Sequence, residues 1–308
     1  MHPVPAPADL QSPSQMVEAL TLLAQGAWQP LAGGTDVFPS LVGKSLSRPL
    51  INLTAIPALR GMSRVSVNGG SFWRIGASET WAALRETRLP AGLEALSQAA
   101  AEIGGRQVQN QGTLGGNLCN ASPAADGVPV LLALDAQVEL QSLRGSRRLA
   151  VADFVLGNRR TAIAADELLV AIDIPLGSHR ARSSFLKLGH RRFLVISIAM
   201  VAVAVDCDAA GRLVRCAIAV GSCSAAARRL ATLESLLVGL AAEEAPAQAA
   251  RALSSDCENL LAPLSPIDDV RGTARYRRDA VRELIPRAMA LSVADVSRSL
   301  TPSSGERS

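Results

Sequence analysis

Two glycine-rich segments of the chain carry residue types that could bind an anion: LAGGTD at residues 31–36 and TLGGN at residues 113–117. Glycine permits positive φ angles and lets a ligand approach the backbone, so that main-chain N–H groups can donate to a phosphate. The side chains of Thr35, Thr113 and Asn117 add hydroxyl and amide groups beside those N–H groups. Each pair of glycines alone also fits a tight turn, but the two segments together predict a site for a diphosphate.

The familiar phosphate motifs do not occur in the sequence. Gly43-Lys44-Ser45 resembles the end of a P-loop, but a P-loop needs a glycine five residues before Gly43, where this chain has Phe38. No G-x-G-x-x-G opens a strand-to-helix turn, which argues against a Rossmann dinucleotide site. A phosphate would therefore be bound by glycine turns of another kind, without a lysine side chain.

The histidines and cysteines form no catalytic or metal-binding pattern. The histidines, at positions 2, 179 and 190, lack metal-ligand spacing, and no G-x-S-x-G nucleophile motif occurs. The five cysteines, at positions 119, 207, 216, 223 and 257, include no C-x-x-C pair. We therefore expect buried free thiols, no disulfide framework, no zinc or iron-sulfur site in this chain, and chemistry supplied by a cofactor.

Length and composition narrow the class of protein. The 308 residues, 48% of them hydrophobic, are enough for two or three subdomains with their own cores. The net charge is +4, but the arginines are scattered and only 3% of the residues are aromatic, so stacking platforms for nucleic-acid bases are missing. Residues 1–9 have neither a basic start nor an apolar run, which predicts no secretory signal and no spanning helix. We expect a cytoplasmic protein that binds neither nucleic acid nor membrane.

Hydrophobic patterning predicts a mixture of strands and helices. Strands are expected over residues 28–32, 50–53, 72–75, 137–140 and 168–174, a helix over 93–103, and a hairpin of residues 197–205 and 213–220. The arginine-rich stretch Arg271–Arg287 predicts a helix whose arginines form a polar face. The polar segment 175–183 is the expected boundary between two domains, and the polar tail 299–308 is expected to be disordered.

Six motifs follow one another along the chain. They are AGGTD (32–36), INL (51–53), WRIGA (73–77), TLGGNLCNASPAADGVPVLLALDA (113–136), LLVAIDIP (168–175) and FLKLGHR (185–191). Together they resemble the FAD-binding medium subunit of the molybdenum hydroxylases, the family of xanthine dehydrogenase and carbon monoxide dehydrogenase. The resemblance covers nearly the whole chain.

The resemblance implies an α+β protein. Its first part would be a two-subdomain FAD-binding fold of the vanillyl-alcohol-oxidase (PCMH) type, and its second a C-terminal sheet-and-helix domain like that of the carbon monoxide dehydrogenase flavoprotein. We expect the FAD-binding domain to comprise residues 1–178, with subdomains of about 1–55 and 56–178. The C-terminal domain would comprise residues 179–298.

The resemblance also implies an activity and partners. The chain would be the FAD-carrying electron-transfer subunit of a xanthine dehydrogenase-like oxidoreductase, a dimer of heterotrimers. A large subunit with a molybdenum-pterin cofactor would hydroxylate an N-heterocycle or an aldehyde, and electrons would pass through two [2Fe-2S] clusters of a small subunit and FAD to NAD. Two alternatives remain open: a stand-alone FAD-dependent reductase of the same fold, and a non-enzymatic assembly subunit that has lost its flavin.

The resemblance assigns FAD contacts residue by residue. The first glycine segment would wrap one side of the diphosphate through its amides, with Asp36 as an acceptor that fixes the loop, and the second segment would close the other side. Leu169 would pack along the flavin or adenine portion, and Ile103 would offer apolar contact to the flavin ring. The full set is Leu31, Ala32, Gly33, Gly34, Thr35, Asp36, Val37, Ile103, Thr113, Gly115, Gly116, Asn117, Asp126, Leu169 and Lys187.

Lys187 and Asp126 each have two open interpretations. Only two of the 31 basic residues are lysine, Lys44 and Lys187, and Lys187 with Arg191 matches a Lys-x-x-x-Arg motif that the family places close to the flavin. Lys187 would favour the reduced, anionic flavin electrostatically, or else be a strand lysine whose ammonium group reaches solvent. Asp126 would accept from the adenosine ribose, or else cap the helix that starts near Pro129.

Two positions depart from the family pattern. Ile103 stands where xanthine dehydrogenases can carry an aromatic residue that stacks on the flavin, and Val195 stands where some relatives have aspartate. The cover of the flavin ring and the recognition of nicotinamide are therefore the least specific parts of the resemblance.

Overall fold

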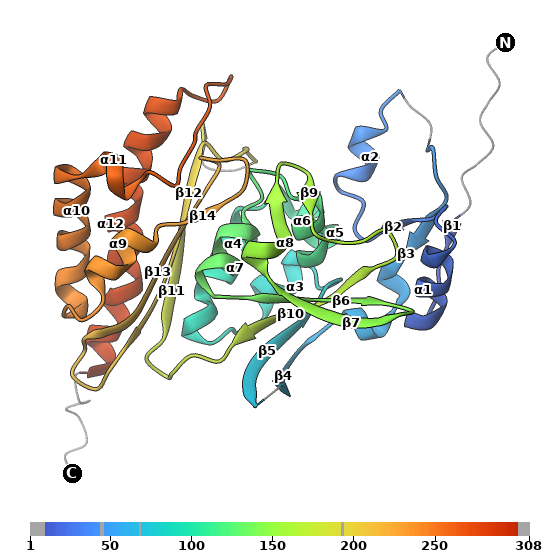
Figure 1. Ribbon diagram of the computed structural model, residues 1–308, viewed down its shortest axis with the longest axis horizontal. Helices are drawn as coiled ribbons and strands as arrows, with labels where there is room; N and C mark the ends of the chain where they lie inside the picture. The colour runs from blue at the N-terminus through green and yellow to red at the C-terminus, as the bar shows by residue number, and fades with distance from the viewer. Residues whose placement is uncertain (1–9, 44–45, 68, 192–193, 301–308) are drawn as a thin grey trace. The chain divides into compact units, whose positions relative to one another are not determined.

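A computed structural model describes residues 10–43, 46–67, 69–191 and 194–300, with side chains described up to residue 294 (Figure 1). Contacts divide the chain into two compact units, and each is discontinuous in sequence. Unit 1 comprises residues 1–83, 104–122 and 135–175, and unit 2 comprises residues 84–103, 123–134 and 176–308. The segments 84–103 and 123–134 are thus grouped with the C-terminal part of the chain.

A small parallel sheet opens unit 1. Its strands are β1 (Leu10–Gln11), β2 (Gln29–Leu31) and β3 (Leu50–Asn52), in the order β1-β3-β2. The connection from β1 to β2 is helix α1 (Met16–Ala24), which buries Ala19, Leu20 and Leu23 at the spacing of one helical face. Strand β2 ends where the first glycine segment begins, followed by the one-turn helix α2 (Val37–Ser40).

The larger sheet of unit 1 is antiparallel throughout. Its order is β4 (Met62–Val67), β5 (Gly70–Gly76), β10 (Leu168–Pro175), β6 (Gln137–Ser142) and β7 (Gly145–Ala150). The central strand β10 is buried from Leu168 to Ile174, whereas β6 alternates half-buried and buried residues, as its alternating sequence predicts. The remaining elements are α5 (Arg106–Gln111), α6 (Leu114–Asn120), α8 (Val151–Phe154), β8 (Val155–Gly157) and β9 (Arg160–Thr161). Helix α3 (Trp81–Glu86) crosses from unit 1 to unit 2.

Unit 2 is built on a second antiparallel sheet with helices on both faces (Figure 1). The strands, in order, are β11 (Arg182–Leu188), β12 (Ala199–Cys207), β13 (Leu213–Gly221) and β14 (Arg228–Arg229). One face packs on α9 (Ala231–Leu237), α10 (Ala245–Ser255), α11 (Cys257–Leu260) and α12 (Ala274–Leu300), and the other on α4 (Glu94–Glu102) and α7 (Gly127–Ala133). Because both faces are covered, β12 is an unbroken apolar run.

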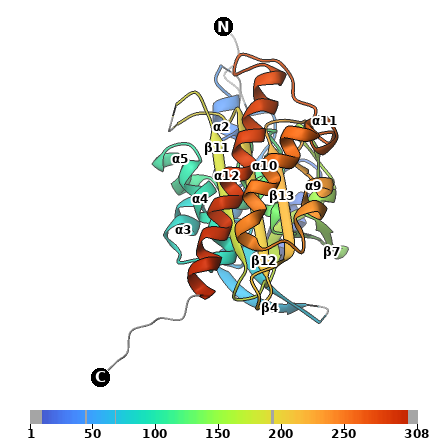
Figure 2. The same cartoon turned by 90° about the vertical axis from the view of Figure 1, so that its left-hand side faces the viewer.

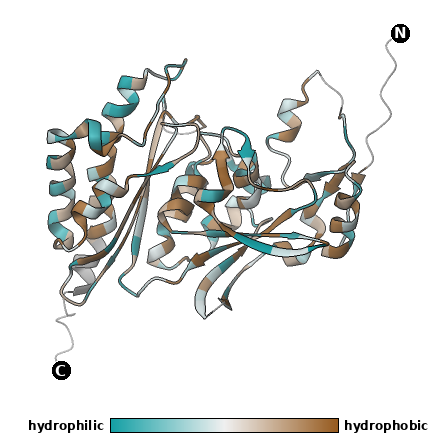
Figure 3. Ribbon diagram, viewed as in Figure 1, coloured by the Kyte–Doolittle hydropathy of each residue, from teal (hydrophilic) through white to brown (hydrophobic). Residues whose placement is uncertain are grey.

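Figure 2 shows the long helix α12 lying lengthwise over β11 and β12. Helix α7 is mostly hydrophobic in Figure 3, and all seven of its residues are buried. Helix α12 continues to Leu300, two residues into the tail predicted to be disordered; residues 301–308 of that tail lie outside the described residues.

The cysteines of the described chain are all free. Cys207, Cys216 and Cys223 are buried, and Cys257 is half-buried. Cys119 is exposed as a residue, but burial of its thiol raises the thiol pKa to about 12. In the described ranges no helix is long and apolar enough to span a membrane.

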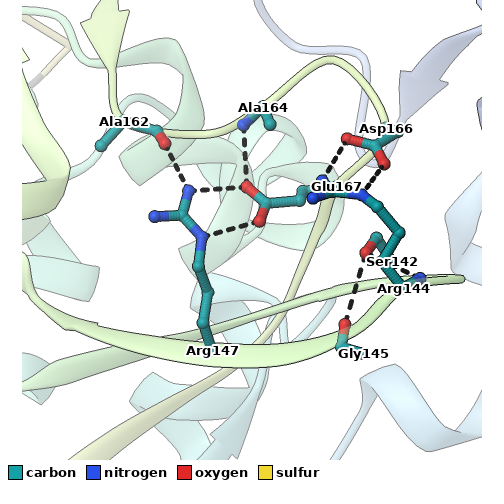
Figure 4. A network of polar contacts seen from close by, with 8 residues as sticks. All are labelled: Ser142, Arg144, Gly145, Arg147, Ala162, Ala164, Asp166 and Glu167. Carbon is teal, nitrogen blue, oxygen red and sulfur yellow. Dashed lines mark hydrogen bonds and ion pairs between the residues drawn. The ribbon is translucent and has the colours of Figure 1, made fainter.

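A network of ion pairs joins the β6–β7 hairpin to the segment before β10 (Figure 4). The Arg147 guanidinium holds the Glu167 carboxylate with two hydrogen bonds of 2.7 and 2.8 Å and also donates to the Ala162 carbonyl. The backbone N–H of Ala164 donates a further hydrogen bond to the Glu167 carboxylate. These contacts, led by the hydrogen bond from Arg147, hold the pKa of the Glu167 carboxyl below its usual range.

We expect Glu167→Gln to lower the free energy of unfolding at neutral pH by about 1.5–3 kcal/mol, the contribution of a hydrogen bond to a charged group. Because the folded-state pKa is depressed, the contribution of Glu167 is present at neutral pH and is lost as the pH falls through the folded-state pKa. Urea denaturation at neutral and at acidic pH measures the free energy of unfolding of both proteins. The difference in this free energy between variant and wild type should be smaller in acid. Asp166→Asn, which breaks the exposed Arg144–Asp166 pair nearby, is the matched control and should have little effect. An equal effect of Glu167→Gln at both pH values would contradict the assignment.

Candidate functional site

The first glycine segment lies against the end of helix α5 within unit 1. A Cβ atom added to Gly33 would come within 1.8 Å of the Gln111 carbonyl oxygen, so that only glycine fits this position. Gly34 has a φ angle of +69°, and a Cβ there would come within 2.4 Å of the Phe38 ring. The residue type at both positions therefore follows from the close approach of two backbones and from a left-handed turn.

The amides of this segment are available to a ligand. The N–H groups of Gly33, Gly34 and Thr35 donate no hydrogen bond within the part of the chain that the structure describes. The Asp36 side chain is exposed and makes no hydrogen bond among the described residues, so its role as a loop-fixing acceptor stays a prediction. Two backbone carbonyl groups of the segment accept hydrogen bonds within the loop: Gly34 accepts from Phe38 N–H at 3.0 Å, and Asp36 accepts from Ser40 N–H at 3.4 Å.

The second glycine segment is the first turn of α6, and its amides are largely occupied. Gly115 N–H donates to the Ala77 carbonyl at 2.9 Å, and Gly116 N–H donates to the Thr113 hydroxyl at 3.0 Å. The expectation of bare amides was therefore wrong here, because the N-terminal residue of a helix caps its own first turn. Gly115 is needed for packing, since its Cβ would come within 2.6 Å of the Ala77 oxygen.

Side-chain groups remain available at the second segment. The Thr113 hydroxyl accepts from Gly116 and still has its own proton to donate. The buried side-chain oxygen of Asn117 has no hydrogen-bond partner among the described residues. An orphaned buried polar atom is uncommon in folded proteins, and a side-chain amide can pair with either a donor or an acceptor of a ligand.

The two segments are neighbours in unit 1. Besides the Gly33–Gln111 approach, a Cβ added to Gly112 would lie 3.5 Å from the Thr35 hydroxyl oxygen. The free amides of the first segment and the free side-chain groups of the second thus belong to neighbouring stretches of unit 1, which we together call the glycine cradle. Main-chain amides, a hydroxyl and a side-chain amide are donors of the kind that a diphosphate needs, so these residues fit the pyrophosphate of a flavin nucleotide.

Lys187 belongs to unit 2 and is buried there in an ion pair. Its ammonium group lies 2.7 Å from Asp126 Oδ2 and 3.1 Å from the Glu102 carbonyl oxygen, and the two charged side chains are 5% and 6% exposed. Ser197 Oγ donates to Asp126 Oδ1 at 2.6 Å. Burial raises the pKa of the Asp126 carboxyl, while Lys187 and Ser197 oppose that rise.

This pair speaks against one of the two interpretations at each position. The Lys187 ammonium group does not reach solvent, so the interpretation as an exposed strand lysine is wrong. Asp126 does precede α7, but its side chain caps no N–H of that helix, because Lys187 and Ser197 engage its two oxygens. Neither Ser197 nor the Glu102 carbonyl was foreseen, since a single serine and a backbone oxygen leave no signal in a sequence.

Two arginines bind the C-terminal end of helix α7, opposite to the end that follows Asp126. Arg215 donates to the Ala133 carbonyl, and Arg229 donates to the Leu132 carbonyl at 3.0 Å. Cations at the last carbonyls of a helix stabilise its C-terminus. Asp126 is therefore presented by a helix held at both ends.

The apolar residues of the expected site are all buried or half-buried. Leu31, Leu169 and Ile103 are buried, with Leu31 and Leu169 in unit 1 and Ile103 at the end of α4 in unit 2. Ala32 and Val37 are half-buried beside the first glycine segment. The described residues contain no cluster of histidine, cysteine and carboxylate groups that could hold a metal ion.

Known proteins are similar in sequence to this protein over most of the chain. Residues 6–177 match the family model of the FAD binding domain in molybdopterin dehydrogenase, and residues 184–291 match the CO dehydrogenase flavoprotein C-terminal domain. The chain is 31% identical to the 6-hydroxypseudooxynicotine dehydrogenase complex subunit alpha of Paenarthrobacter nicotinovorans, covering 88% of this chain and 90% of the relative. It is 32% identical to the nicotine 6-hydroxylase medium subunit of the same organism, covering 90% and 94%.

Solved structures have the same fold. Reconstituted CO dehydrogenase from Oligotropha carboxidovorans contains a chain that matches with a TM-score of 0.83 and 27% identity, covering 94% of this chain and 99% of that chain. Quinoline 2-oxidoreductase from Pseudomonas putida 86 matches in fold, with a TM-score of 0.82 and 24% identity over 95% and 98% of the chains. The family matches and the fold define an FAD-binding flavoprotein. The chain belongs to the FAD-binding medium subunits of the molybdenum hydroxylase family of oxidoreductases.

Proposed function

We propose that this chain transfers electrons from the [2Fe-2S] clusters of a small partner subunit to NAD, in a complex whose large subunit carries a molybdenum-pterin cofactor. The observation that carries the proposal is the cradle at Gly33, with its free amides beside the backbone of Gln111. When bound, FAD would supply the chemistry that collects single electrons and delivers a hydride. The protein positions that cofactor and tunes its electrostatic environment.

The residues of unit 1 divide the task of binding the diphosphate. The amides of Gly33, Gly34 and Thr35 donate to it, and the Thr113 hydroxyl and the Asn117 amide add side-chain hydrogen bonds. Gly115 and Gly116 allow α6 to begin close to the nucleotide. Leu31 and Leu169 provide apolar contact.

In unit 2 we assign Lys187 to the flavin environment, with Asp126 as its partner. The pair carries no net charge, so Lys187 would act through the direction of its ammonium group more than as a free cation. The direct contact between Asp126 and Lys187 supports a role for Asp126 in orienting the lysine, in preference to hydrogen bonding to ribose. Ile103 would contribute only apolar cover to the ring.

Relatives suggest the class of substrate used by the complex. The names of several include nicotine, nicotinate, xanthine or caffeine, all of which are N-heteroaromatic compounds. We therefore propose that the molybdenum subunit hydroxylates an N-heterocycle. Carbon monoxide dehydrogenase chains also occur among the relatives, so carbon monoxide belongs in any substrate panel.

The native complex should be purified through a tag on this chain and analysed for metals and FAD. We expect molybdenum, iron and FAD to co-purify in one assembly, and the flavin to be reduced by N-heterocycle and reoxidised by NAD. Purified chain alone should bind FAD but should not turn over any of these substrates. Turnover by the isolated chain would favour a stand-alone reductase, absence of FAD would favour an assembly subunit, and reoxidation only by oxygen would refute NAD as acceptor.

A further inference from the structure

Arg277, in the first turn of α12, is one of the most deeply buried side chains of unit 2. It is 2% exposed, although the sequence predicted a polar helix face at this position. Its Nη1 donates to the Ile198 carbonyl at 2.5 Å and to the Ser222 carbonyl at 3.0 Å, and its Nη2 forms an ion pair of 2.6 Å with Asp269. A buried arginine needs such partners, because an unpaired charge in the protein interior is strongly unfavourable.

Both carbonyls lie just beyond the paired parts of the sheet. The ladders end at the pairs Leu188–Ala199 and Met200–Gly221, so Ile198 and Ser222 stand outside them. Ser222 has a φ angle of +60°, a left-handed conformation that a serine adopts only when its surroundings hold it there. At this strand end the Ile198 N–H still donates to the Leu188 carbonyl at 2.8 Å, whereas the Ile198 carbonyl accepts from Arg277.

Each of the two carbonyl groups that accept from Arg277 is connected to Asp126 through a few residues. Ile198 follows Ser197, whose hydroxyl donates to Asp126. Ser222 N–H donates to the Pro123 carbonyl at 3.0 Å, and Pro123 lies three residues before Asp126. One guanidinium group is therefore connected in two ways to the Asp126 carboxylate, which binds Lys187.

We propose that Arg277 is a positioning residue for the Lys187–Asp126 pair. Its planar group has donors in fixed directions and can hold two carbonyls and one carboxylate at once, which a lysine cannot do. The inference deepens the proposed function, because it is through this pair that Arg277 would influence the flavin. The contacts themselves involve unit 2 alone.

The scarcity of lysine makes the pair directly observable. A full-length chain labelled with ¹⁵N-lysine has two side-chain signals, from Lys44 and Lys187, and Lys44→Arg assigns them. In Arg277→Met we expect the ammonium protons of Lys187 to exchange with water at least about tenfold faster, because Ser197 and the 123–126 segment lose their support. Arg277→Lys should be intermediate. The control Arg275→Met, on the same helix but 93% exposed, should leave the exchange rate unchanged.

A melting temperature would not distinguish positioning from general stabilisation, whereas the Lys187 signal does. If Arg277→Met folds and exchange at Lys187 is unchanged, the proposal is overturned. If that variant fails to fold, Asp269→Asn is the second test, because it keeps Arg277 but removes the carboxylate that pairs with it. Exchange of the Lys187 ammonium protons should then become about twofold faster or more. An unchanged exchange rate in Asp269→Asn also overturns the proposal. The measurement needs no flavin, so it can fail or succeed whether or not the proposed electron transfer is correct.

Discussion

Gly33→Ala is expected to reduce the affinity for FAD at least about 100-fold, which corresponds to about 2.7 kcal/mol. A methyl group at this position would overlap the Gln111 carbonyl oxygen, which is backbone and cannot rotate away as a side chain could. The glycine segment would have to move, and its three free amides would lose their common direction. The measurement is titration of the apoprotein with FAD, followed by flavin fluorescence.

Gly157→Ala is the matched control for this variant. Gly157 lies in the same unit, has no positive φ angle, and a Cβ added there meets nothing within 4 Å. Gly116→Ala should fall between the two, since its Cβ would approach only the Thr113 hydroxyl, at 2.9 Å. Circular dichroism establishes that each variant is folded. A folded Gly33→Ala protein with wild-type affinity for FAD would show that the cradle does not bind the nucleotide.

Asp126→Asn is expected to destabilise the chain by roughly 3–5 kcal/mol, because it leaves the Lys187 ammonium group buried without its counter-ion. Lys187→Met should cost less. Burial already raises the pKa of the Asp126 carboxyl, so that group can take up a proton when the lysine is removed. The double variant should be more stable than Asp126→Asn alone. Urea denaturation measures all three, and strictly additive effects would contradict a direct coupling.

The effect of Lys187→Met should depend on pH with a definite sign. Without Lys187, the folded-state pKa of Asp126 lies above its unfolded value, so the folded protein binds the proton more tightly. Relative to wild type, the variant should therefore lose stability as the pH rises from the unfolded-state pKa of Asp126 through its folded-state pKa. It should regain that stability in acid. Glu283→Gln, in an exposed ion pair of α12, is the control and should show little difference.

The same variants test the assignment of Lys187 to the flavin. In holoprotein, Lys187→Met should lower the flavin midpoint potential by on the order of 30 mV, equivalent to about 1.4 kcal/mol for a two-electron couple. Asp126→Asn should raise it, because the positive charge is then uncompensated. Unchanged potentials in both variants would leave the pair with a structural role only.

Several features could be read from the sequence for clear physical reasons. The alternation in β6 and the apolar run of β12 reflect whether one or both faces of a sheet are covered, and each leaves its own period in the residues. The glycines at 33, 34 and 115 could be recognised because no other residue fits a left-handed turn or a contact between backbones. The order of the motifs then identified the family.

Other features depend on contacts that sequence patterns do not encode. The two glycine segments are similar in sequence. Among the described residues, however, the amides of Gly33, Gly34 and Thr35 lack partners, whereas the second segment begins a helix and its first turn is capped by Thr113. Arg277 has the same residue type as the exposed Arg275 of its helix, and its burial is decided by the strand ends and loop that surround it.

By itself, the sequence determined which backbone conformations were possible at its glycines, which segments were strands or helices, and to which family the chain belongs, because these follow from local sterics and periodicity. Tertiary structure alone decided which polar groups found partners. Lys187, Asp126, Ser197 and Arg277 are separated along the chain, and only the packing of α4, α7 and α12 on one sheet brings their hydrogen-bonding groups within reach.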